Sequence, residues 1–204
     1  MARFLWSLMA FLAVVIALYA FYILYDQSLL RANDVMAHHL TARPWAVYGH
    51  IGLGALALAI GPFQFLTQVR ARAPELHRAM GRIYVASCLL SGLCGIVLAV
   101  NTAMGPVAMA GFSGLGLCWL VTTSLAFSKA LRRDFTAHRA WMVRSYALTY
   151  AAVMLRIYIP VGLISGFDFP LVYALVAWAC WVPNALFAEA FLRKAEAPVA
   201  VQVA

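Results

Sequence analysis

The sequence predicts an all-α integral membrane protein, a bundle of six transmembrane helices with both termini in the cytoplasm. Of its 204 residues, 65% are hydrophobic and only 11% are charged, whereas a soluble domain has about 45–50% apolar and about 25% charged residues. The apolar residues form six stretches long enough to cross a hydrocarbon core of roughly 30 Å. The basic residues lie mostly between these stretches, as the positive-inside rule requires.

The first span and the segment after it make up residues 1–43. Phe4–Tyr25 contains 22 uncharged residues. This is longer than the apolar stretch of about 7–15 residues in a signal peptide, so we expect a retained helix. Asp26–Arg43 is predicted to be a polar external loop containing His38 and His39.

Residues 44–165 are predicted to form a core domain of four membrane helices. The basic segments Arg70–Arg82 and Lys129–Arg139 precede the third and fifth spans, and Asn101–Pro106 forms a tight turn. Gly61-Pro62 should kink the second span or free one of its backbone carbonyls. The four predicted spans are Trp45–Gln68, Ile83–Val100, Val107–Ser128 and Ala137–Pro160.

Residues 166–204 are predicted to hold the sixth span and a short cytoplasmic tail. Ser165–Asp168 is the turn before the span Phe169–Ala188, which should break near Pro183 and Asn184. We expect the Ala- and Val-rich end of the chain to be disordered.

The positive residues set the predicted orientation. Eleven of the 15 Lys and Arg residues fall on one side of the membrane and only Arg31 and Arg43 fall on the other. The remaining two, Arg144 and Arg156, lie inside the fifth span. The net charge of +8 therefore orients the chain and contacts anionic head groups, which disfavours a role in nucleic-acid binding. The eleven residues are Arg3, Arg70, Arg72, Arg78, Arg82, Lys129, Arg132, Arg133, Arg139, Arg193 and Lys194.

Small and polar residues recur at helical spacing along one face of three predicted spans. Such faces allow close helix packing, with the polar side chains bonding across the interface. These residues are His50, Gly54, Ala57, Gly61, Gln64 and Gln68 in the second span, His77, Gly81, Tyr84, Cys88, Ser91 and Gly95 in the third, and His138, Ser145, Thr149, Ala152 and Arg156 in the fifth.

Two polar residues are expected in the outer half of the membrane. At 1.5 Å per residue, His50 lies about 7–8 Å below the outer interface and Arg156 about 18 Å above the inner one. An arginine inside an apolar span costs roughly 2.5–3.5 kcal/mol on insertion scales, so it should face protein or a wet cavity. We predict one outer pocket lined by both residues, with Tyr158 and Asn101 beside them.

A second group of candidate residues gathers at the cytoplasmic ends of the third and fifth spans. Helix N-termini with arginines are typical of a site for a lipid phosphate, a haem propionate or a carboxylate. An arginine-rich interface anchor is the alternative, above all for Arg70, Arg72, Arg132 and Arg133. His77 and His138 are the candidate haem ligands, and no other metal ligands are predicted. The other candidates are Arg78, Arg82, Arg139 and Arg144, approached by Gln64, Gln68 and Asn184.

The segments that begin with His77-Arg78-Ala79 and His138-Arg139-Ala140 are similar, and each opens a span that runs outward. A duplicated unit of two helices would produce this match. Parallel selection for positive charge on the cytoplasmic side would also explain the arginines.

Several familiar kinds of site are disfavoured. The four cysteines lie inside apolar spans and form no Cys-x-x-Cys pair, so they are expected to be packing residues. The chain has no nucleophile elbow, phosphate loop, metalloprotease motif or paired carboxylates, which makes a hydrolase or transferase a poor fit. Glu189 is expected to pair with Arg193, four residues further on. The cysteines are Cys88, Cys94, Cys118 and Cys180.

Three groups of motifs occur in order along the second, third and fifth spans. They are Gly49-His50-Ile51-Gly52 with Gly61-Pro62-Phe63-Gln64-Phe65, Leu76-His77-Arg78 with Gly81-Arg82-Ile83-Tyr84, and His138-Arg139 with the segment 141–149. Together they resemble the bacterial family of predicted membrane proteins of unknown function numbered 2306, over about residues 50–156. The resemblance implies a multi-pass protein of the bacterial inner membrane with no established activity. Small cytochrome b modules are similar only in carrying histidines on helices.

Three functions are compatible with the sequence. The favoured one is a redox-type module that binds haem b or a quinone through intramembrane His and Arg side chains. The second is a carrier of small molecules, suggested by the broken helices and by His50 and Arg156. The third is a non-catalytic protein that binds lipid, such as anionic lipid, or assembles with a partner.

Overall fold

The computed structural model describes residues 2–32 and 34–196, which form eleven helices and no strand. The end of the chain that is expected to be disordered, from residue 197 on, lies outside the described residues. The helices are α1 (Ala2–Tyr25), α2 (Ser28–Arg31), α3 (Asp34–Ala42), α4 (Pro44–Gln64), α5 (Thr67–Arg72), α6 (Pro74–Val100), α7 (Gly105–Leu131), α8 (Phe135–Thr149), α9 (Ala151–Ile164), α10 (Phe169–Ala179) and α11 (Val182–Glu196).

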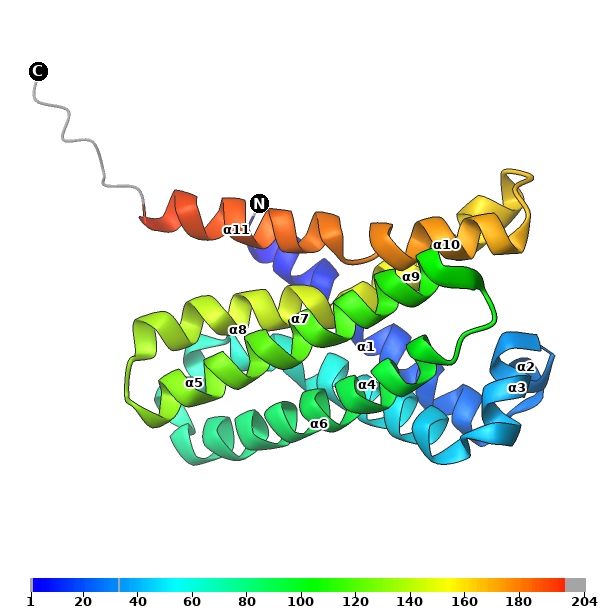
Figure 1. The fold of residues 1–204 in the computed structure, drawn as a ribbon. Coiled ribbons are helices and arrows are strands. Elements are labelled where there is room, and N and C mark those ends of the chain that lie inside the picture. The colour runs from blue at the N-terminus through cyan, green and yellow to red at the C-terminus, as the bar shows by residue number, and fades with distance from the viewer. Residues whose placement is uncertain (1, 33, 197–204) are drawn as a thin grey trace, which may run out of the picture.

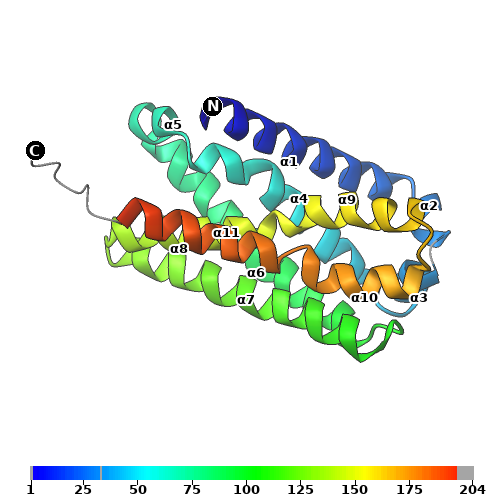
Figure 2. The same cartoon turned by 90° about the horizontal axis from the view of Figure 1, so that it is seen from above.

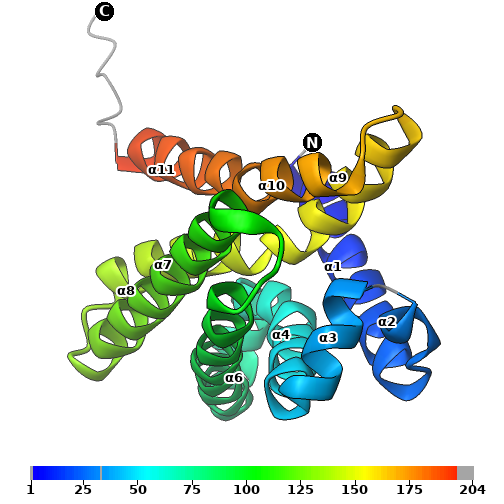
Figure 3. The same ribbon diagram turned by 45° about the vertical axis from the view of Figure 1, so that its right-hand side comes forward.

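Six helical segments of the described chain are long and apolar enough to cross a membrane, which confirms the predicted all-α bundle of six membrane helices. α1, α4, α6 and α7 each provide one span, α8 with α9 provides the fifth, and α10 with α11 the sixth. Neighbouring helices contact one another in the order α1, α4, α6, α7, α10 and α9, and α9 also contacts α1. α8 packs against α4, α7 and α11 (Figures 1 and 3).

Both described ends of the chain lie toward the same end of the bundle (Figure 2). α1 begins and α11 ends on the side that carries α5 and the turn between α7 and α8. Because Arg70, Arg72, Arg132 and Arg133 are exposed there, we call this side the basic end. The opposite side carries α2 and α3, and we call it the cap end. The placement of the basic end in the cytoplasm stays a prediction.

The segment between the first two spans differs from its prediction as a polar loop. It contains α2 and α3, whose residues Leu30, Val35 and Leu40 are buried. Leu30 and Leu40 join a core cluster with Leu98 from α6. The segment is helical because a few apolar residues at helical spacing find a surface to cover, even though most of the segment is polar.

Only some of the breaks within spans lie at the prolines where the sequence predicts them. α4 continues through Pro62 but ends at Gln64, and α6 begins at Pro74 within a predicted loop. The sixth span breaks just before Pro183, which lies in the first turn of α11, where a missing N–H needs no partner. The fifth span breaks at Tyr150, which the sequence did not predict.

The predicted small-residue faces of α4 and α6 pack against each other. A Cβ atom added at Gly54 would lie 3.0 Å from Ser91 Oγ, and one added at Gly81 would lie 3.3 Å from Gln64 Oε1. A Cβ at Gly61 would meet the ring of Tyr84 at 3.3 Å. Glycine therefore allows the close approach of these two helices.

Five side chains from α6, α7 and α8 form a hydrogen-bonded hub in the interior. The hydroxyl of Tyr84 lies 3.0 Å from Ser145 Oγ and 2.9 Å from Thr149 Oγ1. Thr123 Oγ1 lies 2.7 Å from Ser145 Oγ. Trp119 Nε1 donates to Thr149 Oγ1 at 2.9 Å. All five residues are buried.

Every hydroxyl proton of the hub has an acceptor. The Thr149 hydroxyl donates to the Ser145 carbonyl at 3.0 Å, so Tyr84 must donate to Thr149. The Ser145 hydroxyl then donates to Tyr84, and the Thr123 hydroxyl donates to Ser145. A hub that is satisfied in this way has the properties of a structural element.

We expect Tyr84→Phe to lower the free energy of unfolding in detergent by about 1–2 kcal/mol, because two buried hydroxyls lose their partner. Tyr146→Phe is the matched control, since the Tyr146 hydroxyl is buried without a partner among the described residues. Unfolding by a denaturing detergent measures both variants. Equal stability of the two variants would contradict a structural role for the hub.

Candidate functional site

A cavity of about 400 Å³ lies among the spans, toward the cap end. Its volume falls within the roughly 300–1,000 Å³ of small-molecule sites. The wall is mostly apolar, and no acidic residue lines it among the described residues. We call it the cap-end cavity. Its main polar side chains are Tyr19, His39, His50, Thr149, Arg156 and Tyr173.

His50 is held on the cavity wall by α6. Its Nδ1 lies 3.0 Å from the Ser91 carbonyl oxygen, which only accepts, so Nδ1 carries the proton. The Ser91 hydroxyl donates in return to the His50 carbonyl at 2.8 Å. A Cβ at Gly95 would lie 2.8 Å from Nδ1, so glycine makes room for the ring. In the neutral imidazole, Nε2 is then the hydrogen-bond acceptor.

Arg156 lines the same cavity from α9. Its Nη1 donates to the Ala152 carbonyl at 3.0 Å, one turn earlier in the helix. Its Nε is buried and has no partner among the described residues. The structure thus places His50 and Arg156 on one cavity, and their role in ligand binding stays a prediction.

The two residues predicted beside them are not in the cavity wall. The side chain of Asn101 accepts a hydrogen bond from Arg43 at 2.6 Å and donates to the Val97 carbonyl at 2.8 Å. Tyr158 packs against the core cluster between α9 and α10. Both residues therefore have structural contacts.

His39 is a cavity residue that sequence reasoning missed. It lies on α3, is only 2% exposed and lines the cap-end cavity, and its Nδ1 has no partner among the described residues. The spacing of Val35 and His39 on one face of a short helix is the signal that could have found it.

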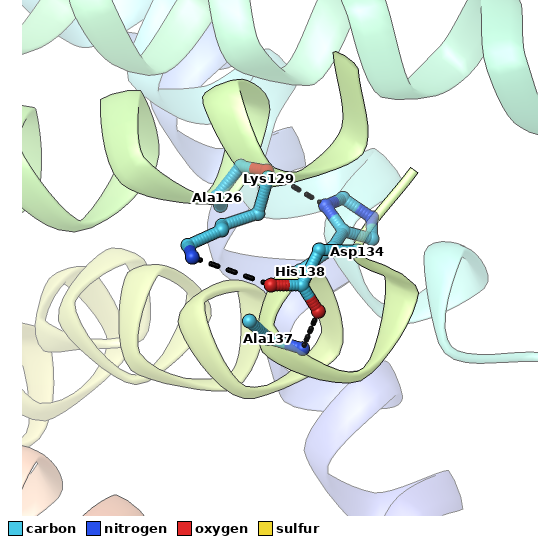
Figure 4. Close-up of polar contacts among 5 residues, drawn as sticks. All are labelled: Ala126, Lys129, Asp134, Ala137 and His138. Carbon is cyan, nitrogen blue, oxygen red and sulfur yellow. Dashed lines mark hydrogen bonds and ion pairs between the residues drawn. The ribbon is translucent and has the colours of Figure 1, made fainter. Parts of the chain in front are cut away.

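At the basic end, His138 forms a hydrogen bond with the backbone of α7 (Figure 4). Its Nδ1 lies 2.8 Å from the Ala126 carbonyl oxygen, so this nitrogen is the donor. Asp134 caps α8 by accepting from the Ala137 N–H at 3.1 Å, and it forms a 3.2 Å salt bridge with Lys129. His138 thus fixes the turn between α7 and α8 and keeps Nε2 as an acceptor.

Arg144 forms a salt bridge with an acidic residue of α11. Its Nε lies 2.5 Å from Glu189 Oε1 and its Nη2 lies 2.9 Å from Oε2. The guanidinium carbon also lies 4.6 Å from the centre of the Trp141 ring. The expected pairing of Glu189 with Arg193 is wrong, because the partner comes from α8.

The other residues of the predicted anion site separate into two groups. Arg78, Arg82 and Arg139 are exposed. Gln64 and His77 each have a buried side-chain nitrogen without a partner among the described residues. Neither His77 nor His138, the candidate haem ligands, lines the cap-end cavity.

These features define a multi-pass membrane protein with a cavity of ligand size among its spans. The chain belongs to the family described as "Predicted membrane protein (DUF2306)", whose model matches residues 47–192. The match covers the predicted resemblance and extends it through the sixth span. Searches of curated proteins and of solved structures each gave no match.

The cap over the cavity should respond to pH through His39. Burial of the ring, with the positive charges of His38 and Arg43 nearby, lowers the pKa of His39 below its ordinary value of 6.5. The neutral ring therefore stabilises the folded cap above about pH 6.5, and this stability is lost as the pH falls through the lowered pKa.

We expect hydrogen exchange in α3 to accelerate on acidification in the native chain and to lose this dependence in His39→Leu. His38→Leu removes the exposed histidine next to it on the same helix. It should keep the acid-induced acceleration but show it at a higher pH, because it removes one of the charges that lower the pKa of His39. The same acid-induced acceleration in His39→Leu as in the native chain would contradict this assignment.

Proposed function

We propose that the cap-end cavity binds a quinone and that the protein is a redox-type module of the bacterial cytoplasmic membrane, with both termini in the cytoplasm. The observation that carries the proposal is a largely apolar cavity of about 400 Å³ that is lined by both His50 and Arg156. The excess of Lys and Arg in the segments at the basic end supports the orientation.

The chemistry of a quinone matches this wall. A quinone is a flat apolar ring with two carbonyl acceptors, and its reduced form carries hydroxyl donors. The buried Nε–H of Arg156, which has no partner among the described residues, is a suitable donor to a carbonyl. Nε2 of His50 is the matching acceptor for a quinol hydroxyl, because Nδ1 is bonded to Ser91. The apolar wall accommodates the ring.

Haem b fits the cavity less well. It would use His77 and His138 as axial ligands, and neither residue lines the cap-end cavity. A Soret band in the absorption spectrum of the purified protein would favour haem over a quinone.

One observation favours a carrier as the second candidate. The breaks in the fifth and sixth spans lie at the cavity wall, which Thr149, Ala151 and Cys180 line. Interrupted helices beside a cavity are typical of transport sites. Flux of decylubiquinone across proteoliposomes that is lost in Arg156→Gln would favour this function over a redox role.

We expect decylubiquinone to quench tryptophan fluorescence saturably, because Trp119 lines the cavity. Arg156→Gln should weaken binding at least tenfold, which corresponds to 1.4 kcal/mol. His50→Asn should have a similar effect, since the asparagine amide can still donate to the Ser91 carbonyl while Nε2 is lost.

Arg139→Gln is the matched control, because Arg139 is exposed at the basic end. It should bind decylubiquinone as the native chain does. Native affinity in both cavity variants, or equal loss in the control, would contradict the proposal.

A further inference from the structure

His39 is a buried polar side chain in the cap that α3 forms over the cavity. It is only 2% exposed, it lines the cap-end cavity, and its Nδ1 has no partner among the described residues. A buried polar group without a partner costs about 1–3 kcal/mol. An apolar residue would therefore suit this position better if packing were its only role.

Other contacts hold α3 in place. Leu40 is buried in a core cluster with Leu98 of α6. Arg43, which directly follows α3, donates to the side chain of Asn101 at 2.6 Å and so connects the cap to the end of α6. Neither contact uses the ring of His39, so the polarity of this ring is not needed to position the cap.

The ring of His39 borders two open spaces. One is the cap-end cavity, and the other is a pocket of about 90 Å³ between α3 and the turn after α6. His38 is exposed and lines the smaller pocket, and its ring centre lies 5.5 Å from that of His39. The other residues around this pocket, Val35, Ala103 and Met104, have apolar side chains. The cap-end cavity is thus the space of ligand size that adjoins the ring.

The polar side chains of the cavity lie at two levels. His50 lies six residues after Pro44, where α4 begins at the cap end, or about 9 Å along the helix axis. Arg156 lies eight residues before Ile164, where α9 ends at the cap end (Figure 2), or about 12 Å along the axis. The charge of Arg156 acts on the ring of His50, which agrees with this shared level. His39 lies on α3 in the cap itself, five residues before α4 begins.

We infer that His39 is a second ligand-binding group of the cap-end cavity, so that the ligand lies between the cap and the pair of His50 and Arg156. This inference rests on the proposed function and specifies how the quinone is bound. A quinone with carbonyl oxygens on opposite sides of its ring accepts a hydrogen bond from Arg156 at one side and from His39 at the other. The bound ligand thereby fastens α3 over the cavity.

The protonation state of His39 suits this role. Burial of the ring lowers the pKa of His39 below its ordinary value of 6.5, so the ring is neutral at pH 7.5. A neutral imidazole has one N–H donor and one acceptor nitrogen. It can therefore donate to the carbonyl of a quinone and accept from the hydroxyl of the reduced form.

The first test measures binding of decylubiquinone to the full chain in detergent at pH 7.5 by quenching of tryptophan fluorescence. His39→Leu should raise the dissociation constant at least tenfold. His39→Asn should stay within about threefold of the native value, because its amide both donates and accepts. His38→Leu is the matched control, since it removes the exposed neighbouring histidine, and it should bind as the native chain does.

The second test measures hydrogen exchange in α3 with and without saturating decylubiquinone. Exchange in the native chain should slow about tenfold on binding, because a ligand that contacts the cap stabilises its closed state. In His39→Leu, at a concentration that saturates the quenching, exchange in α3 should stay unchanged. The comparison in the native chain keeps the inference falsifiable if His39→Leu fails to fold.

The outcomes separate this inference from the quinone proposal. Native affinity in His39→Leu would overturn only the role of His39, and so would unchanged exchange in α3 of the native chain while quenching saturates. An equal loss of affinity in His38→Leu would also overturn it, because the loss would then follow from a disturbed cap. Absence of saturable quenching in the native chain would instead refute the proposed function, and this inference with it.

Discussion

Hydrocarbon offers no hydrogen-bond partner, so a polar group inside the bundle must find one in the protein, in water or in a bound molecule. Thr149 is where this constraint is met most fully. Its hydroxyl accepts from Trp119 and Tyr84 and donates to the Ser145 carbonyl, which joins α6 and α7 to α8. The fifth span breaks at the next residue, Tyr150. The hub thus fixes α8 in the interior, and α9 starts anew and carries Arg156 to the cavity wall.

Satisfaction of hydrogen bonds separates the structural polar groups from the candidate ligand-binding groups. The hub is complete, whereas unpartnered buried atoms occur on either side of it among the described residues. His39 and Arg156 have such atoms at the cap-end cavity, and Gln64 and His77 have them toward the basic end. Thr149 and Trp119 belong to the hub and also line the cavity. The Thr149 hydroxyl and the Trp119 indole N–H, both already bonded within the hub, therefore form part of the cavity wall and offer no free donor to a ligand.

The sequence predicted the features that depend on the length of the apolar stretches and on the spacing of residues along a helix. The six spans, the facing small-residue faces of α4 and α6, and the position of His50 and Arg156 on one cavity follow from helical geometry. The salt bridge from Arg144 to Glu189 joins residues 45 positions apart, and no spacing rule specifies it. The cap formed by α2 and α3 was missed because its burial depends on the cluster around Leu98. The break at Tyr150 was missed because it adjoins a tertiary network rather than a proline or glycine.

The distribution of acidic residues makes Arg156 distinctive. Among the acidic side chains that the structure describes, Glu189 is the one that lies within a candidate span beyond its first turn. Its carboxylate is occupied by Arg144. Arg156 therefore has no carboxylate from the described residues, although it lines a cavity with a mostly apolar wall. Beyond the Ala152 carbonyl that accepts from its Nη1, a cation in such surroundings is stabilised by water or by a molecule that brings acceptor oxygens. The charge balance of the described residues thus favours a molecule with acceptor oxygens as the ligand of the proposed site.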